Sequence, residues 1–408
     1  MSLDATLTLD EAAGRCWDAI VVGAGPAGAL AARQLALAGV DVLLVDRAPF
    51  PRWKVCGCCL SVAALETLRS VGLGGLVERC GGVPLARVCL GVAGRSALLQ
   101  LPGGRSLSRE VFDAALVESA VSAGVSFLPL TQARAPLTPN PFSPRGEGRK
   151  KVPSPLGGEG RVRGVALRRL LLRQRDRETN ATTRLLLAAD GLNGSVLSRE
   201  PGCEPVVRPG SRIGAAAMAE SVPSFFAEGT IYMACGEGGY VGLVRLEDGR
   251  LDVAAALDPW LIRRHGGLAG SVAAILGGIG WPVVPRLAEL SWRGTPALTR
   301  RPSCLAGPRF FVLGDAAGYV EPFTGEGIAW ALASAVALAP LAVEAVRDWR
   351  PELARDWQAL HRRVFGPRRR LCSAVTRVLR WPRLVRLLVG MLAWTPFLAA
   401  PLVRRLHS

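Results

Sequence analysis

Histidine and lysine are scarce in this chain of 408 residues. It has three His and three Lys, so 47 of its 50 basic residues are Arg. The three histidines, His265, His361 and His407, are all far in sequence from the CGCC cluster at 56–59. A zinc site built on that cluster would need a second pair of ligands at suitable spacing, and none is evident. We therefore expect no metal site.

Acidic residues are missing from one end of the chain. The segment 361–408 has 11 Arg and no Asp or Glu, and the segment 136–164 has six basic residues against two acidic ones. These two segments carry +11 and +4 of the formal net charge of +17, so the rest of the chain carries about +2. A nucleic-acid-binding protein would carry basic charge across its binding domain. We therefore expect no nucleic-acid partner.

The ten cysteines lack the regular spacing of a disulfide framework. The first 17 residues contain Asp4, Asp10 and Glu11 where a secretory signal would have basic and then apolar residues. These two features predict reduced thiols and a cytoplasmic protein. With 50% hydrophobic residues, the chain can bury a large core and form two domains.

Residues 18–46 have the pattern of a dinucleotide-binding unit. A β-branched run at 18–22 is followed by the turn GAGPAG at 23–28, a helix over 29–38, a strand at 40–45 and then Asp46. Gly23 permits a tight turn, Gly25 allows a phosphate to approach the backbone, and Gly28 lets helix and strand pack closely. Asp46 is placed to accept hydrogen bonds from a ribose and disfavours a 2′-phosphate.

The remaining segments predict an α/β architecture. Strands are expected at 185–189 and 310–313, an antiparallel sheet between about 211 and 258, and an uncharged helix over 327–343. That helix is long enough to span a membrane, but its position after a ligand-type turn favours a buried helix. The Pro- and Gly-rich segment 136–164 contains an imperfect repeat and predicts a solvated insertion.

Four motifs together resemble the FAD-dependent oxidoreductases of the aromatic hydroxylase and geranylgeranyl reductase superfamily. They are GAGPAG with Asp46, ADGLNGSVLSR at 189–199, GDAAGYVEPFTGEGIAWAL at 314–332, and FPRWKVCGCCLS at 50–61. The resemblance implies a Rossmann-like FAD-binding domain with an interleaved antiparallel-sheet substrate domain and a helical C-terminal region. The FAD-binding segments would be 18–85, 106–200 and 301–345, the substrate-domain segments 86–105 and 201–300, and the C-terminal region 346–408.

The resemblance also implies roles for individual residues. Asp315 would bind hydroxyl groups of FAD, Pro322 would lie beside the isoalloxazine, and the backbone from Gly325 onward would face the pyrimidine end of the flavin. Cys56 and Tyr240 are the candidate catalytic residues. The full set of candidate cofactor-binding residues is Gly23, Gly25, Ala27, Gly28, Asp46, Arg47, Arg52, Lys54, Arg109, Asp190, Gly191, Gly314, Asp315, Pro322, Gly325, Gly327 and Ile328.

The implied activity is oxidation or reduction of a lipophilic small molecule, and two chemistries stay open. One is hydroxylation of a phenol or quinone, and the other is reduction of an isoprenoid double bond. Because the chain has only one dinucleotide fingerprint, NAD(P)H is expected to be a transient co-substrate. A halogenase-like enzyme is a further alternative, although the paired Trp before Ile-Pro of those enzymes is missing and Gly280-Trp281-Pro282 stands instead.

The basic C-terminal region allows two interpretations. Arg377, Arg380, Arg383 and Arg386 recur every three residues among apolar residues, with Pro382 interrupting the pattern. Such a segment can lie on an anionic membrane at its inner face, or mediate partner binding, or pack on the FAD domain as a helical cap. The oligomeric state stays open.

Overall fold

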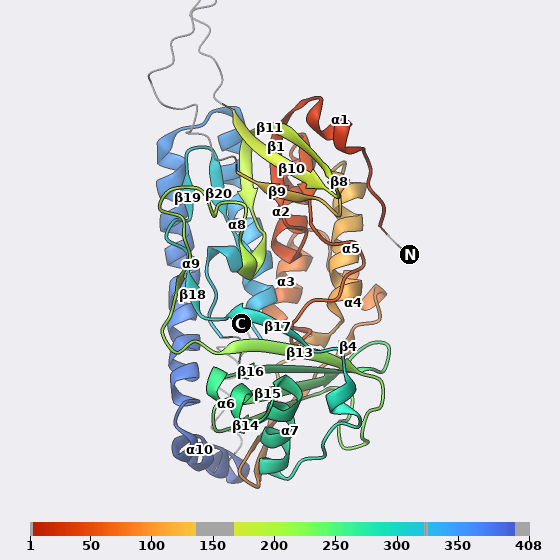
Figure 1. Ribbon diagram of the computed structural model, residues 1–408, viewed down its shortest axis with the longest axis vertical. Helices are drawn as coiled ribbons and strands as arrows, with labels where there is room; N and C mark the ends of the chain where they lie inside the picture. Colours follow the sequence, from red (N-terminus) through yellow and green to blue (C-terminus); the bar gives the residue numbers. More distant parts are fainter. Residues whose placement is uncertain (1–2, 136–166, 322, 324, 396–408) are drawn as a thin grey trace, which may run out of the picture.

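The predicted βαβ unit forms near the start of the chain. In the computed structural model, which describes residues 3–135, 167–321, 323 and 325–395, β1 (Cys16–Val22) leads through the glycine turn into α2 (Pro26–Leu37) and β2 (Val42–Val45) (Figure 1). The helix begins three residues earlier than predicted, because Pro26 has the backbone angle of a first helical residue and needs no hydrogen bond there.

This unit lies at the centre of the first sheet. Its strand order is β19-β20-β11-β1-β2-β8, and the pairs from β20 to β8 are parallel. Two further strands extend it by antiparallel pairing, β10 with β11 and β9 with β10. The strands beyond the βαβ unit are β8 (Ser126–Leu128), β9 (Gln132–Arg134), β10 (Arg168–Gln174), β11 (Arg177–Ala188), β19 (Ala306–Gly307) and β20 (Phe310–Val312).

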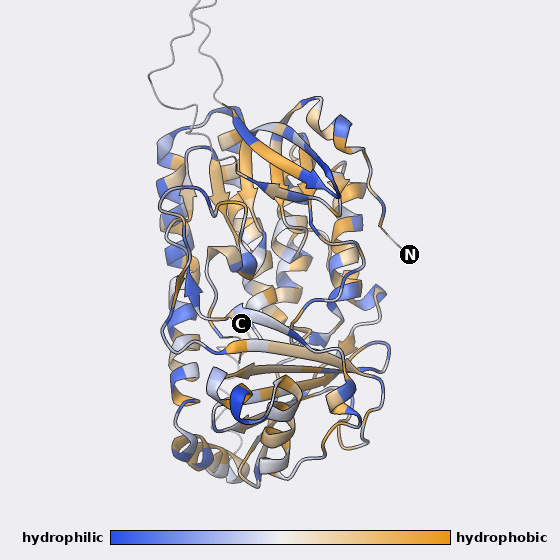
Figure 2. Ribbon diagram, in the orientation of Figure 1, coloured by the Kyte–Doolittle hydropathy of each residue, from blue (hydrophilic) through white to orange (hydrophobic). Residues whose placement is uncertain are grey.

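Helices cover one face of this sheet, and the β9–β10 layer with α1 (Leu9–Ala13) covers the other. The parallel strands are apolar at the centre of the sheet, over 19–22, 42–45 and 185–188, where both faces are buried (Figure 2). The helices in the first core are α2, α3 (Val62–Ser70), α4 (Leu76–Arg79), α5 (Arg109–Ser122), α8 (Gly327–Arg347) and α9 (Pro351–Val378). The Rossmann-like α/β fold predicted from the sequence is confirmed.

The apolar helix predicted at 327–343 is α8, which continues to Arg347. It is the one helix of the described residues whose length and composition would allow it to cross a membrane. Half of its most apolar stretch of 18 residues is buried, and Leu332, Ala335 and Leu338 lie in the core with α2. Its apolar composition is thus accounted for by packing within the protein.

The second sheet has the order β17-β13-β16-β15-β14-β5-β6. The strands between 213 and 257 are antiparallel, as predicted for this segment, and β5 joins them by parallel pairing with β14. The strands are β5 (Arg87–Val92), β6 (Arg95–Gln100), β13 (Ile213–Ala219), β14 (Thr230–Gly236), β15 (Gly239–Arg245), β16 (Leu251–Leu257) and β17 (Arg293–Ala297).

The two faces of the second sheet have different neighbours. Val241, Leu243 and Val253 pack against α7 (Leu268–Ile279), which follows α6 (Pro259–Arg264). Side chains alternate along a strand, so Tyr240, Gly242 and Val244 lie on the opposite face. Tyr240 packs there with Tyr319 and Phe323, which places this face toward the FAD domain.

Two further short sheets connect these layers. The first has the order β3-β7-β4, and the second pairs β12 with β18. Their strands are β3 (Cys59–Leu60), β4 (Val83–Pro84), β7 (Arg105–Ser106), β12 (Val206–Val207) and β18 (Arg300–Arg301). Three short 3-10 helices are η1 (Gly191–Asn193), η2 (Leu287–Glu289) and η3 (Gly314–Ala317).

The chain then descends through α9 and turns into α10 (Pro382–Trp394) at the far end of the molecule (Figure 1). The arginines spaced by three residues therefore do not share one helix: Arg377 ends α9, Arg380 lies in the turn, and Arg383 and Arg386 are on α10. Pro382 starts the new helix. The predicted insertion at 136–164 and the end of the apolar run 387–403 lie outside the described residues.

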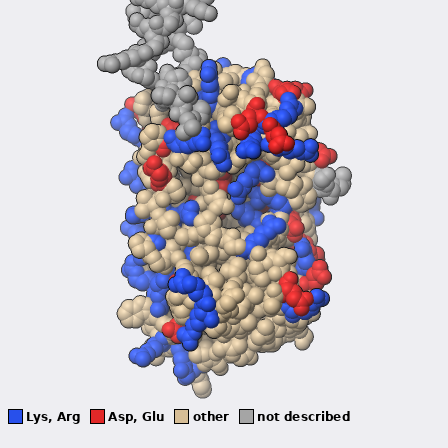
Figure 3. Space-filling view, in the orientation of Figure 1, with Lys and Arg blue, Asp and Glu red and all other residues tan. Residues whose placement is uncertain are grey.

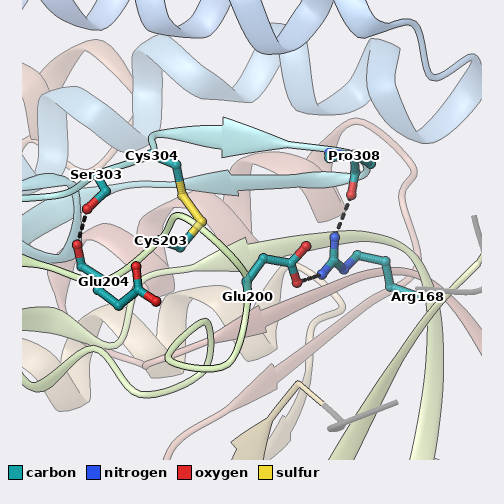
Figure 4. Close-up of a disulfide and its surroundings, with 7 residues drawn as sticks. All are labelled: Arg168, Glu200, Cys203, Glu204, Ser303, Cys304 and Pro308. Atoms are coloured by element: carbon teal, nitrogen blue, oxygen red, sulfur yellow. Dashed lines mark hydrogen bonds and ion pairs between the residues drawn. A yellow bond between two sulfur atoms is a disulfide. The ribbon is translucent and has the colours of Figure 1, made fainter. Parts of the chain in front are cut away.

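A disulfide joins Cys203 and Cys304, whose Cα atoms are 5.1 Å apart (Figure 4). The expectation that all ten thiols are reduced is therefore wrong for this pair. The two cysteines are 101 residues apart in sequence, so spacing gave no sign of the bond. Beside it, Arg168 pairs with Glu200 and donates to Pro308 O at 2.6 Å, and the Ser303 hydroxyl donates to Glu204 O. These contacts hold the 200–205 segment against the edge of the first sheet.

Replacing both cysteines, Cys203→Ser with Cys304→Ser, should lower the free energy of unfolding by about 3–5 kcal/mol, because a long loop of the unfolded chain is released. Chemical denaturation with and without a reductant checks this result. The reductant should destabilise the parent protein and leave the double variant unchanged. A parent protein that is indifferent to the reductant, or that shows ten free thiols when denatured without one, would contradict the bond.

Candidate functional site

The glycine turn brings β1 and α2 closer together than any side chain would allow. Gly23 has a φ of +101°, and a Cβ on it would lie 2.4 Å from Ala189 O. A Cβ on Gly28 would lie 1.8 Å from Gly23 O. Both positions therefore require glycine for packing. Ala27 and Gly314 meet in the same way, since a Cβ on Gly314 would lie 2.7 Å from the Ala27 methyl.

Gly25 is different, because the space above it is open. It caps the N-terminus of α2, and a Cβ built on it would meet only two guanidinium nitrogens, Arg52 Nη2 at 3.6 Å and Arg109 Nη2 at 3.8 Å. Arg52 Nε is also buried with no hydrogen-bond partner among the described residues. Unpaired helix N–H groups and two guanidinium groups around one open position suit a diphosphate.

Asp113 holds these two arginines in place. Its Oδ1 accepts from Arg109 Nε at 2.8 Å and its Oδ2 from Arg109 Nη2 at 2.7 Å, and Arg52 Nη2 lies 3.3 Å from Oδ2. All of Asp113 is buried. The sequence analysis missed this residue, although its position four residues after Arg109 is the spacing of one helix face and was a usable signal.

A groove of about 470 Å³ runs past this position. Asp46 lies at the end of β2 and accepts from the backbone N–H groups of Ala24 at 2.8 Å and Ala48 at 2.9 Å. Burial lowers the pKa of the Lys54 ammonium, and the nearby Arg109 and Arg52 lower it further. The predicted residues lining the groove are Gly23, Gly25, Asp46, Arg47, Arg52, Lys54 and Asp190.

A second groove of similar size, about 470 Å³, meets the first at Asp190. It is lined by Gly191 of η1, Asp315 of η3, Arg300 and the disulfide. Asp190 Oδ2 accepts from the backbone N–H groups of Ser195 at 2.6 Å and Val196 at 2.9 Å. Burial raises the pKa of both Asp190 and Asp315, and the Lys54 ammonium opposes that rise at Asp315. The three predicted Gly and Asp motifs thus converge on one continuous surface.

The last predicted motif lies at the start of α8. Gly325 has a φ of +72° and Gly327 begins the helix, whereas the Ile328 side chain is buried in the core, so only its backbone could face a ligand. Pro322 lies outside the described residues. Arg369 of α9 donates to Ala317 O and Gly318 O, both at 2.8 Å, and so supports the Asp315 turn. No motif in the sequence connects Arg369 with Asp315.

Cys56 lies in the loop after β2, close to Arg109. A hydrogen bond with the Cys58 thiol is the largest cause that lowers the pKa of Cys56, and the Arg109 guanidinium adds to it, so that the pKa falls from 9.0 to about 6 despite burial. The same loop is covered by Asp252 of β16, which interacts with Cys58, is fully buried and has an Oδ1 without a hydrogen-bond partner among the described residues. Burial holds the pKa of Asp252 well above its usual value.

Tyr240 lies on the same sheet face as Asp252, four residues along β15 from Val244, because Tyr240 pairs with Ala256 and Asp252 pairs with Val244. Its ring packs edge-on against Phe323 at 5.0 Å, and its buried hydroxyl has no partner among the described residues. Burial raises the pKa of Tyr240 well above 10.0, and Glu321 adds to the rise. Cys56 and Tyr240, both proposed from the sequence, therefore lie at separate positions on this face.

Comparison with known proteins agrees with this geometry. Residues 17–98 match the model of an FAD binding domain. The chain is 28% identical over 386 residues to the menaquinone reductase of Mycolicibacterium smegmatis, covering 88% of this chain and 84% of that protein. It is 29% identical over 354 residues to digeranylgeranylglycerophospholipid reductase 1 of Methanopyrus kandleri, covering 81% and 82%.

A shorter match has a higher sequence identity. The menaquinone reductase of Mycobacterium tuberculosis is 48% identical over 68 residues, and this match spans 17% of the present chain and 16% of that relative. Two solved structures have the same fold. A geranylgeranyl bacteriochlorophyll reductase-like protein of Thermoplasma acidophilum has a TM-score of 0.72 at 18% identity, covering 93% and 92% of the two chains. A flavin-dependent brominase has a TM-score of 0.71 at 17% identity, covering 96% and 94%.

The residues fit FAD. The open cradle at Gly25 with the unpartnered Arg52 Nε suits its diphosphate, and Asp46 and Asp315 place carboxylates toward the two ends of the continuous groove. The N-terminus of α8 offers unpaired backbone N–H groups near Gly325 and Gly327, where the sequence motif predicts the flavin pyrimidine.

Alkylation of Cys56 by iodoacetamide should rise with pH to half its maximum near pH 6, because only the thiolate reacts. The Cys58→Ala variant should shift this midpoint upward by about one pH unit or more, since it removes the largest cause of the lowered pKa. Peptide mass mapping locates the label. Cys59→Ala is the matched control and should leave the midpoint in place. A parent midpoint near pH 9 would refute the assignment.

Glu326 makes folding stability depend on pH. It is 4% exposed at the N-cap of α8, its Oε1 has no partner among the described residues, and burial raises its pKa from 4.5 to about 7 against the opposing Arg368 guanidinium. The folded state therefore holds the proton more tightly than the unfolded state. The stability that this proton contributes is complete below pH 4.5 and is lost as pH rises to about 7.

Glu326→Gln should remove that dependence. Relative to the parent, the variant should gain up to about 3 kcal/mol of unfolding free energy between pH 4.5 and pH 8. Urea denaturation of both proteins across this range measures the difference. Equal pH profiles for the two proteins would show that the carboxyl is ionised in the folded state throughout.

Proposed function

We propose that this chain, a member of the FAD-dependent oxidoreductases of the aromatic hydroxylase and geranylgeranyl reductase superfamily, uses NAD(P)H to reduce a carbon–carbon double bond in the polyprenyl chain of a lipid. The observation that carries the proposal is a strip of small residues on the sheet face toward the FAD domain. The reaction adds a hydride to one carbon of the double bond and a proton to the other.

The strip crosses three adjacent strands, β13, β16 and β15. Cross-strand pairing places Ala254 beside Gly242 and Ala216, and Ala256 beside Gly214. Gly242 and Ala254 are half-buried even though they sit in the middle of a seven-stranded sheet whose other face is covered by α7. Solvent therefore reaches the sheet at this point from the FAD side. At Gly214 the side chains of Thr295 and Leu298 already fill the strip, so its open part lies at Gly242 and Ala254. An elongated apolar chain can lie across this open part.

Apolar residues surround the strip. On one side of it lie Met233, Tyr240, Tyr319 and Phe323, and on the other lie Met218, Val244 and Leu246. Gly242 leaves the middle of the strip without a side chain. A polyprenyl chain gains free energy from burial on such a surface, whereas a small phenol would leave most of it uncovered.

The relatives favour reduction over hydroxylation. Both full-length relatives are named as reductases, and menaquinone and digeranylgeranylglycerophospholipid both carry polyprenyl chains. Halogenation has weaker support. Trp281, the residue nearest to a halogenase-like pattern, packs with Tyr232 and Phe225 on the α7 side of the sheet, away from the FAD domain.

The residues of the chain bind the cofactor, position the substrate and supply the proton. The chemistry that bound FAD would supply is the transfer of hydride from NAD(P)H to the substrate. The Arg52 and Arg109 guanidinium groups and the α2 N-terminus hold its diphosphate. Burial raises the pKa of the Tyr240 hydroxyl and the pKa of the Asp252 carboxyl, which favours the protonated form of each. They border the strip at its two ends, and each is placed to give a proton to a substrate carbon lying across it.

The holoenzyme is tested anaerobically with NADH or NADPH and with either menaquinone or a geranylgeranyl glycerophospholipid in detergent. The expected product has gained two hydrogen atoms at a double bond, as measured by mass spectrometry. Ala254→Phe fills the strip and should lower kcat/KM for the lipid by about tenfold or more. Reduction of bound FAD by the nicotinamide should stay unchanged.

Ala254→Ser is the matched control and should behave like the parent enzyme. A product that requires oxygen and contains an added oxygen atom would overturn the reductase assignment in favour of hydroxylation. If Ala254→Phe reduced the lipid as fast as Ala254→Ser does, the substrate would not lie on the strip.

A further inference from the structure

A stripe of apolar side chains lies exposed along α10. Its members, Leu384, Leu387, Met391 and Trp394, follow at intervals of three or four residues and so share one side of the helix. Leu387 is 65% exposed and Trp394 is 89% exposed. Single exposed apolar residues need no explanation, but a continuous stripe on one helix marks an interaction surface.

The other side of the same helix is fixed to the protein. Val385 and Val389 are buried against Val92 and Ala97 of the second sheet. The turn before the helix is held as well, since Arg380 donates to Gly210 O at 2.7 Å and lies 3.4 Å from Asp258. The exposed stripe therefore has a fixed orientation and points away from the body of the molecule.

Positive charge borders the stripe. Arg383 and Arg386 are exposed on α10 and have no ion pair within the described residues. Arg95 of β6 reaches the same edge, since a Cβ on Gly390 would lie 2.5 Å from its Nη1. Residues 361–408 contain no acidic side chain. Figure 3 shows basic side chains gathered at this end of the molecule, where Figure 1 places α10.

We propose that α10 is a membrane-docking helix that lies in the surface of an anionic lipid bilayer. Its apolar stripe enters the boundary between head groups and acyl chains, Trp381 and Trp394 lie at head-group level, and Arg383, Arg386 and Arg95 contact lipid phosphates. A second copy of the chain is less suited to cover the exposed stripe of α10. Two copies that met through this surface would bring the same arginines together without an acidic partner.

Docking by α10 would also place the substrate surface near the lipid, a consequence that rests on the proposed function. Val385 and Val389 belong to the same apolar cluster as Met233 and Tyr240, which border the strip of small residues. A lipid that leaves the bilayer beside α10 would meet a continuous apolar surface leading toward the FAD domain.

Flotation of the holoprotein with vesicles tests the docking surface without any substrate, so its outcome is separate from that of the proposed reaction. The parent protein should bind phosphatidylglycerol–phosphatidylcholine vesicles and bind pure phosphatidylcholine vesicles about tenfold more weakly. Leu387→Glu with Trp394→Glu should weaken binding about tenfold or more. Leu37→Glu, at a position 59% exposed on α2, is the matched control and should bind like the parent.

The charge is tested with Arg383→Ala and Arg386→Ala together, which should weaken binding to the anionic vesicles by about tenfold. Arg263→Ala with Arg264→Ala removes the same charge from exposed positions on α6 and should have no such effect. Flavin absorbance and Tm should match the parent in every variant.

Three outcomes would overturn the proposal. The first is a parent protein that does not bind anionic vesicles, and the second is an equal loss of binding in test and control variants. The third is a dimer in sedimentation analysis that Leu387→Glu dissociates, because the stripe would then be an interface between two copies of the chain.

Discussion

The close packing of α2 on the end of β1 is the constraint on which the site depends. At Gly23 and Gly28 the backbones approach so closely that no Cβ fits, and this approach brings the open N-terminus of α2 to Gly25 beneath Arg52 and Arg109. Asp113 then keeps the two guanidinium groups over that position. A wider separation of helix and strand would turn the helix N-terminus away from these charges and disrupt the cradle for the diphosphate.

The two layers of the molecule form different surroundings, one for the cofactor and one for the proposed substrate. The FAD domain presents charged and hydrogen-bonded groups along its grooves, whereas the second sheet presents small and apolar side chains with two buried acids, Asp252 and Tyr240. Cys56 lies between them. The pKa of Cys56 falls to about 6 while burial raises the pKa of Asp252, so this boundary region favours the thiolate of Cys56 and the protonated form of Asp252.

The C-terminal region joins the layers as well as carrying charge. Arg212 and Glu321 form a buried ion pair at 2.8 Å between the sheet and the segment that follows η3, and Asp258 and Arg380 extend the network to the turn before α10. Removing one member would leave a buried charge without its partner, so the network resists separation of these elements. The same residues set the direction in which α10 faces. The concentration of arginine near the chain end thus includes both structural groups and free surface groups.

The sequence by itself determined the FAD-binding fold, the glycine turn and the residues that line the grooves, because these depend on local conformation and on short, regular spacings. It also pointed to Cys56, and the helical spacing of Arg109 and Asp113 could have identified their pair. Only the tertiary structure decided which distant groups meet: the Cys203–Cys304 disulfide, Arg369 on the turn at Ala317, and Asp252 over the Cys56 loop. It also decided that α10 has one buried and one exposed apolar side. Such contacts join segments 50 to 200 residues apart, and no local pattern encodes them because chain topology alone brings them together.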